Sequence, residues 1–104
     1  MKIIALEHEI PGASTRQSSL NSKAEAAKVW VLYQIGLVRE IFFRHDQTTA
    51  VLVLECACLD EARAALSELP LVQAGLINFE LIPLKPYSGF ARLFTPSEKG
   101  KQDQ

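Results

Sequence analysis

The chain has 104 residues, of which 48% are hydrophobic and 22% charged, and its formal net charge is -1. This length and composition fit one globular domain that buries its own core without metal or disulfide staples. They argue against a disordered or membrane-spanning protein. With Lys and Arg scattered along the chain, they also argue against binding to a nucleic-acid backbone.

The first ten residues, MKIIALEHEI, contain a short apolar run that is broken at Glu7, so we predict no signal peptide. Cys56 and Cys58 stand two apart, which is unfavourable for a disulfide between them and is not a C-x-x-C motif. Two Cys and two His show no zinc-ligand spacing, so we predict no metal site. The interpretation is a cytoplasmic protein with two buried thiols.

Residues 2–10 contain five apolar residues and no helix- or strand-breaking residue before Pro11-Gly12, which predicts a strand that ends in a turn. The polar residues 11–21 predict a loop. Ser22-x-x-Glu25 has the form of a capping box, so we predict a helix over 22–35 that ends at a left-handed Gly36. This helix is apolar over more than one stripe, which indicates packing on two surfaces.

The remaining pattern predicts two strands that form a hairpin, a one-sided helix that Pro70 ends, a short turn and a last strand. The predicted ranges are 37–45, 48–57, 59–69, 71–75 and 77–84. The order βαββαβ predicts a ferredoxin-like α+β fold, a four-stranded antiparallel sheet with both helices on one face.

Most of the predicted strands have largely apolar side chains in both alternation sets, for example Ile3 and Ala5 against Ile4 and Leu6. Helices cover only one face of such a sheet, and strands with their other face in water would alternate cleanly between apolar and polar residues. We therefore predict that a second copy covers the other face, giving a homodimer or a higher homo-oligomer.

Residues 85–94 follow the last strand as an apolar arm, because Pro83 and Pro86 cannot donate to a sheet ladder. We predict that this arm lies across the neighbouring subunit. The domain is thus predicted to span 1–94, followed by a polar, frayed tail over 95–104.

Two stretches carry a family resemblance: L-S-E-L-P-L at 66–71, which leads into F-E-L-I-P-L at 79–84, and the strand entry from Gly36 to Arg44. With the βαββαβ order, they resemble the muconolactone isomerase-like group of dimeric α+β barrel proteins. The resemblance implies two sheets packed face to face and activities such as lactone isomerisation, cofactor-free oxygenation or dehydration. It also implies that Arg39, three places after Gly36, faces an anionic substrate. The next position in the family pattern is a histidine, and here it is Glu40.

Several side chains are candidates for a site, and each has a structural alternative. His8 lies among apolar residues and is either a core or interface residue or a general base; Glu7 and Glu9 beside it point to the opposite face. Arg39, Glu55 and Glu80 form either buried ion pairs or part of a site. Trp30 and Tyr33 either pack in the core or line a cleft between helix and sheet.

Two hypotheses of different classes follow. The first is a small cofactor-independent enzyme that moves a proton on a small carbonyl or lactone compound. Its predicted site comprises His8, Glu40 and Glu55 for the proton, Arg39 for a substrate carboxylate, and Trp30 and Tyr33 for the pocket wall. The second is a non-catalytic homo-oligomer that binds a small ligand or serves assembly. A haem-degrading monooxygenase is disfavoured, because neither His has a recognisable haem-ligand context.

Overall fold

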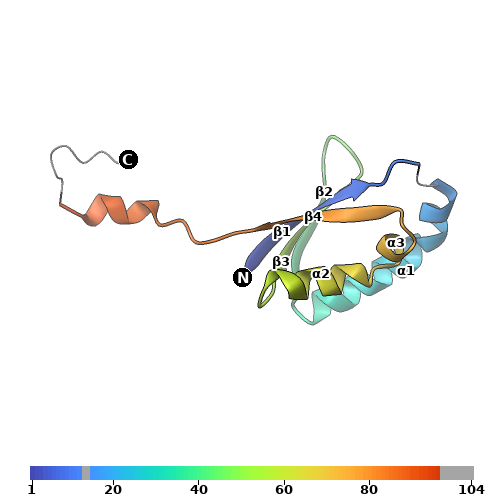
Figure 1. The fold of residues 1–104 in the computed structure, drawn as a ribbon, viewed down its shortest axis with the longest axis horizontal. Helices are drawn as coiled ribbons and strands as arrows, with labels where there is room; N and C mark the ends of the chain where they lie inside the picture. Colours follow the sequence, from blue (N-terminus) through green and yellow to red (C-terminus); the bar gives the residue numbers. More distant parts are fainter. Residues whose placement is uncertain (13–14, 97–104) are drawn as a thin grey trace.

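The computed structural model describes residues 1–12 and 15–96, which form one antiparallel sheet, three helices and a projecting arm (Figure 1). The elements are β1 (Lys2–Glu9), α1 (Thr15–Gln34), β2 (Val38–Phe43), β3 (Ala50–Glu55), α2 (Leu59–Ser67), α3 (Pro70–Gln73), β4 (Ile77–Pro83) and the 3-10 helix η1 (Gly89–Phe94).

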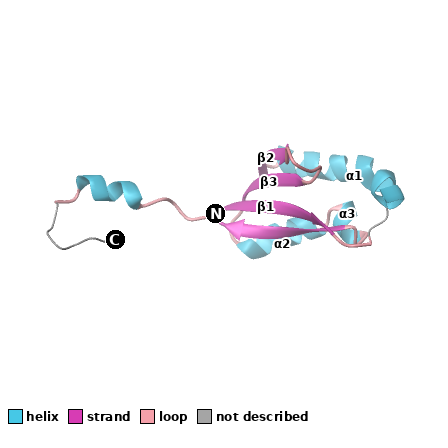
Figure 2. Ribbon diagram, turned by 90° about the horizontal axis from the view of Figure 1, so that it is seen from above, coloured by secondary structure: helices cyan, strands magenta, loops and turns pink. Residues whose placement is uncertain are grey.

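The strand order is β2-β3-β1-β4, and each neighbouring pair is antiparallel. The helices α1, α2 and α3 lie on the same side of the sheet (Figures 1 and 2). This arrangement confirms the predicted ferredoxin-like α+β fold. The face of the sheet opposite the helices is called the open face below.

The core lies between the helices and the sheet. It is built from the helix-facing residues of the two central strands, such as Ile3, Leu52 and Leu54, from Leu66 of α2, and from Leu69 just before α3. All five are at most 3% exposed. Alternate residues of a strand point to one face, which is why Ile3 and Ala5 are buried while Ile4 and Leu6 are only partly so.

Helix α1 begins at Thr15 and not at Ser22, so the predicted loop over 11–21 is wrong from residue 15 onward; residues 13 and 14 lie outside the described part of the chain. The Ser22-x-x-Glu25 pattern therefore lies inside the helix and is not a capping box. The segment between Thr15 and Gly36 contains no Pro or Gly that would break a helix, so the helix can extend back to Thr15. Its end is as predicted: Gly36 has a φ of 85°, and Leu37 N–H bonds the carbonyl of Leu32.

The segment predicted as a turn at 71–75 is largely helical, because α3 starts at Pro70 and ends before Gly75. Proline at the first position of a helix has no N–H to leave unpaired, so it starts this helix as readily as it ends the previous one. Gly75, with a φ of 76°, then turns the chain into β4.

The prediction of two buried thiols is half wrong. Cys56 is buried and Cys58 is exposed, and both are free. Strand β3 ends at Glu55, so the alternation that would bury both residues does not extend to Cys58.

The arm after β4 projects from the domain, so the molecule measures 63 Å along its longest axis but only 29 and 23 Å along the others (Figures 1 and 2). The predicted extended arm contains the short helix η1. Four large apolar side chains on it, Tyr87, Phe90, Leu93 and Phe94, are 68 to 84% exposed. Of the tail predicted at 95–104, residues 97–104 lie outside the described part of the chain.

Candidate functional site

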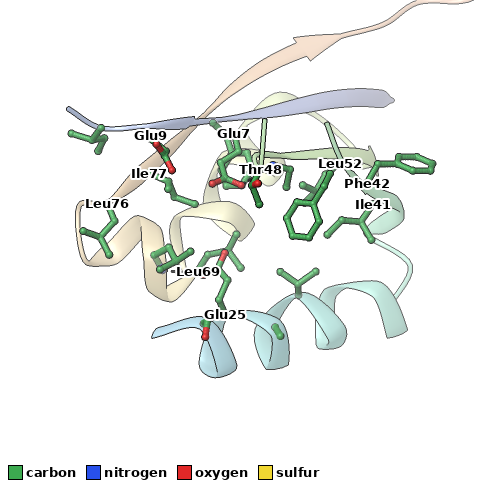
Figure 3. Close-up of a pocket in the computed structure, with 18 of the residues that line it drawn as sticks. Glu7, Glu9, Glu25, Ile41, Phe42, Thr48, Leu52, Leu69, Leu76 and Ile77 are labelled. Carbon is green, nitrogen blue, oxygen red and sulfur yellow. Dashed lines mark hydrogen bonds between the residues drawn. The ribbon is translucent and has the colours of Figure 1, made fainter. Parts of the chain in front are cut away.

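A cavity of about 1220 Å³ lies between α1 and the helix-facing side of the sheet (Figure 3). Its lining is mainly apolar and comes from all four strands, α1 and the segment before β4. Ala26, Val29, Leu52, Leu69, Ile77 and Phe79 are members of this lining. The cavity is large enough for a small organic molecule.

The cavity exists because α1 stands away from the edge of the sheet. Between residues 20 and 34 of α1, Leu32 is the one fully buried side chain. Ile41 and Phe43 pair with Leu52 and Ala50, so they belong to the helix-facing side, yet they are 46% and 72% exposed. In the edge strand β2, Val38 is buried in the core, whereas Ile41 and Phe43 are not covered by α1.

Two carboxylates project into this cavity from opposite walls (Figure 3). Glu7 comes from the helix-facing side of β1, and its Oε1 accepts a hydrogen bond of 2.8 Å from the backbone N–H of Ala50. Burial raises the pKa of Glu7 above 4.5; the Ala50 bond opposes this shift, and the charge of Glu9 adds to it.

Glu25 comes from α1, and its Oε1 accepts a hydrogen bond of 2.9 Å from the backbone N–H of Leu71. This bond links α1 to the start of α3. Burial raises the pKa of Glu25 above 4.5; the Leu71 bond lowers it, and the charge of Glu7 raises it further. The two carboxylates thus interact electrostatically across an apolar cavity.

Replacing Glu7 by Gln is expected to stabilise the fold near neutral pH. A carboxyl group whose pKa is raised in the folded state makes its full contribution to the stability of the fold at a pH below its ordinary pKa of 4.5. This contribution is lost as the pH rises through the pKa of the folded state. The Gln oxygen still accepts the bond from Ala50. We expect a melting temperature about 2 to 4 °C higher, which corresponds to roughly 0.5 kcal/mol after discounting for solvent screening.

Circular dichroism melts at fixed protein concentration test this expectation. The difference between Glu7→Gln and wild type should shrink as the pH falls toward 4.5. Glu68→Gln, at a carboxylate that pairs with Lys28 outside the cavity, serves as the control. A variant less stable than wild type near neutral pH would contradict a desolvated carboxylate at position 7.

Four of the predicted site residues line the cavity: Trp30, Tyr33, Arg39 and Glu40. Trp30 and Tyr33 stack with ring centroids 5.7 Å apart. Arg39 stands in a β-bulge, because the pairing of β2 with β3 shifts between Val38 and Glu40. Its Nε donates a hydrogen bond of 2.6 Å to the carbonyl of Gly36, which places the guanidinium between the end of α1 and the edge strand.

The other two predicted site residues lie outside this cavity. His8 is on the open face, where its Nε2 is 3.1 Å from Oε1 of Glu80. Oε2 of Glu55 lies 2.8 Å from the N-terminal ammonium group, whose hydrogen bond lowers the pKa of Glu55. The structure therefore brings together Arg39 and Glu40 with Glu7 and Glu25, and it separates His8 and Glu55 from them.

Sequence reasoning did not identify Glu7 and Glu25 as site residues, although the sequence contains patterns that point to both. Alternation along β1 already placed Glu7 on the face opposite His8, which is the face that the helices cover. Glu25 is one helical turn before Val29 and two before Leu32, on the side of α1 that faces the sheet. Because Glu25 was assigned to a capping box with Ser22, it was not considered as a cavity residue.

Within residues 1–12 and 15–96, no three His, Cys, Asp or Glu side chains are grouped so that they could hold a metal ion. None of the helices in this described part is long and apolar enough to span a membrane.

No family model matches the sequence, and no curated protein matches it significantly. Among solved structures, the chain is similar to 5-chloro-2-hydroxyhydroquinone dehydrochlorinase from Burkholderia phenoliruptrix AC1100 in complex with 2,5-dihydroxybenzoquinone. The TM-score is 0.68 at 19% identity, and the match covers 86% of this chain and 98% of that chain. At this identity the similarity establishes the fold, a ferredoxin-like α+β sheet covered by helices on one face.

Proposed function

We propose that this protein is a small enzyme that transfers a proton on a small carbonyl or lactone compound bound between α1 and the sheet. The observation that supports this most is the pair of carboxylates, Glu7 and Glu25, on opposite walls of one apolar cavity. Their raised pKa values bring both groups closer to neutral pH, where a carboxyl group can both accept and return a proton.

In this proposal Glu7 and Glu25 replace His8 and Glu55 as the proton carriers. Each uses Oε1 for a backbone bond, and no described residue donates a hydrogen bond to its second oxygen. One carboxylate removes a proton next to the substrate carbonyl, and the other, as a carboxylic acid, returns a proton to a different atom. The backbone bonds fix both groups before the substrate arrives.

Arg39 and the aromatic wall complete the proposed site. Proton removal next to a carbonyl places negative charge on the carbonyl oxygen, and the guanidinium of Arg39 stabilises this charge. Its Nε is engaged with Gly36, so the two terminal nitrogens are the groups directed to the substrate. Trp30 and Tyr33 form the wall of the pocket, and Glu40 lies next to Arg39. The reaction requires no cofactor.

Membership in the muconolactone isomerase-like family is part of this proposal. It is supported by the ferredoxin-like fold and by the placement of Arg39, which follows Gly36 by three positions and lines the cavity. The similar dehydrochlorinase structure, with a small ring compound bound, is consistent with a small-molecule enzyme on this fold. A cytoplasmic location, supported by two free thiols, is proposed with it.

The experiment is proton exchange in heavy water. The protein is incubated with a panel of small cyclic ketones and unsaturated lactones, and the loss of proton signals next to the carbonyl is followed by NMR. We expect exchange well above the buffer rate for at least one compound. Exchange at the buffer rate across the panel would contradict the proposed reaction.

The alternative is a non-catalytic homo-oligomer that binds a small ligand or serves assembly, and the open face favours it. This face carries partly exposed apolar residues on every strand: Ile4, Leu6, Phe42, Val51, Val53 and Ile82. Exposed patches of this kind mark interaction sites. We propose that a second copy covers the open face in both the enzyme and the alternative, giving a dimer with two sheets packed face to face.

Removing the arm after Lys85 is expected to weaken this dimer more than the fold. The four exposed side chains of the arm contact no part of the core, so their burial is available to a neighbouring subunit. We expect a dimer dissociation constant about 10 to 100 times higher, with a circular dichroism melt that changes little at high concentration. Analytical ultracentrifugation measures the first quantity. A truncated chain with unchanged dissociation would refute the role of the arm.

A further inference from the structure

We infer that the cavity selects uncharged substrates over carboxylates of the same size and shape. This inference rests on the proposed function, because it concerns the substrate class of the same site. It differs from the implication of the family resemblance, in which Arg39 holds a substrate carboxylate.

The charges that line the cavity carry the inference. Four carboxylates, Glu7, Glu9, Glu25 and Glu40, contribute to the lining, and Arg39 is the one cationic side chain among the described lining residues. A carboxylate ligand therefore meets an excess of like charge in a partly apolar space, where such repulsion is stronger than in water.

The position of Arg39 does not offset this excess. Its Nε already donates to the Gly36 carbonyl, and its charge also acts on Glu55, outside the cavity. Lys28, one helical turn after Glu25 on α1, pairs with Glu68 at 3.1 Å and does not line the cavity. The described lining thus contains one partly engaged cation for four carboxyl groups, and three of these are still anions when one of Glu7 and Glu25 carries a proton.

The repulsion already acts between the protein's own carboxylates. Burial is the largest cause of the raised pKa of Glu7 and of Glu25, and the backbone hydrogen bond of each group opposes it. The negative charge of Glu9 raises the pKa of Glu7 further. The charge of Glu7 adds to the shift at Glu25 in the same way. A further carboxylate between these walls would raise the electrostatic energy again, whereas a neutral hydroxyl or amide can donate a hydrogen bond to the Glu oxygens.

The test compares two probes of one shape: an unsaturated five-membered lactone that carries either a carboxymethyl group or the corresponding carboxamide. Trp30 lines the cavity and is the one tryptophan of the chain, so its fluorescence reports binding directly. Near neutral pH we expect the carboxamide to bind about 10 to 100 times more tightly than the carboxylate.

Two variants sharpen the comparison. Glu25→Gln removes one negative charge and retains an oxygen for the Leu71 bond, so the preference for the carboxamide should fall several-fold. Arg39→Gln should increase it, since the cation is the group that favours the carboxylate. Tighter binding of the carboxylate by the wild type, lost in Arg39→Gln, would overturn the inference and restore the role of Arg39 as the carboxylate site.

The experiments distinguish a failure of the charge selectivity from a failure of the enzymatic proposal. If the carboxamide preference is found but no compound exchanges protons, the charge selectivity stands and the enzymatic proposal is wrong. If exchange is observed and the carboxylate binds as well as the carboxamide, the enzyme stands and the selectivity is wrong. If neither probe changes the Trp30 fluorescence or the NMR spectrum, the cavity is not the binding site and the inference is overturned.

Discussion

Replacing Glu25 by Gln is expected to lower the rate of proton exchange by about 100- to 10,000-fold, the usual contribution of a positioned acid or base. The variant should keep its fold, because the amide oxygen of Gln still accepts the hydrogen bond from Leu71 that ties α1 to α3. The loss should appear in kcat more than in KM, since a proton carrier acts in the transition state. The measurement is the NMR exchange rate on the best compound of the panel.

Glu7→Gln should cause a loss of similar size, and the double variant should lose little more than either single one. Residues that act together in one reaction give strongly non-additive effects. Two independent losses that multiply would indicate separate roles, for example binding by one group and catalysis by the other.

Controls from the open face separate this proposal from the assignment that the sequence alone favours. His8→Gln and Glu80→Gln alter a pair whose atoms are 3.1 Å apart on the other side of the sheet. Both variants should retain exchange close to the wild-type rate. If His8→Gln abolishes exchange while Glu25→Gln retains it, the base is His8, and the reaction takes place at the open face.

Much of the fold is readable from the sequence because its signals are local. Alternation identifies the strands, left-handed glycines end α1 and α3, and Pro70 separates two helices. The error at the start of α1 is instructive. The pattern Ser22-x-x-Glu25 has the composition of a cap, but residues 15–21 continue the helix, and the carboxylate bonds Leu71 instead.

The site is harder to predict because it depends on distances between elements. The position of Arg39 at the cavity follows from a bulge that shifts the pairing of β2 with β3, and no residue pattern in the sequence predicts that bulge. The cavity itself exists because α1 leaves Ile41 and Phe43 uncovered, which is a property of how the helix packs as a whole. Alternation did place Glu7 on the face opposite His8, but both faces are largely apolar, so it did not identify the face that the helices cover. It could not show that Glu25 would face Glu7.

Placing a charge in the middle of the open face is the most direct test of the proposed dimer. Ile4 pairs with Val53 on one side and Ile82 on the other, so Ile4→Lys introduces an ammonium group among apolar side chains. In a single chain this group faces water, because the open face has no helix over it. In a dimer of facing sheets it is buried without a partner, and two-fold symmetry introduces it twice.

We therefore expect Ile4→Lys to raise the dimer dissociation constant at least about 100-fold, which corresponds to roughly 2.7 kcal/mol, and to leave the circular dichroism spectrum of the monomer native. Ala64→Lys adds the same charge on the exposed surface of α2 and should leave the dimer intact. Light scattering over a dilution series measures both. An Ile4→Lys variant as dimeric as wild type would show that the open face is not the interface. The subunits would then have to associate through the arm or through the exposed apolar residues at the end of α1, where Val31, and Ile35 just after the helix, are 45% and 67% exposed.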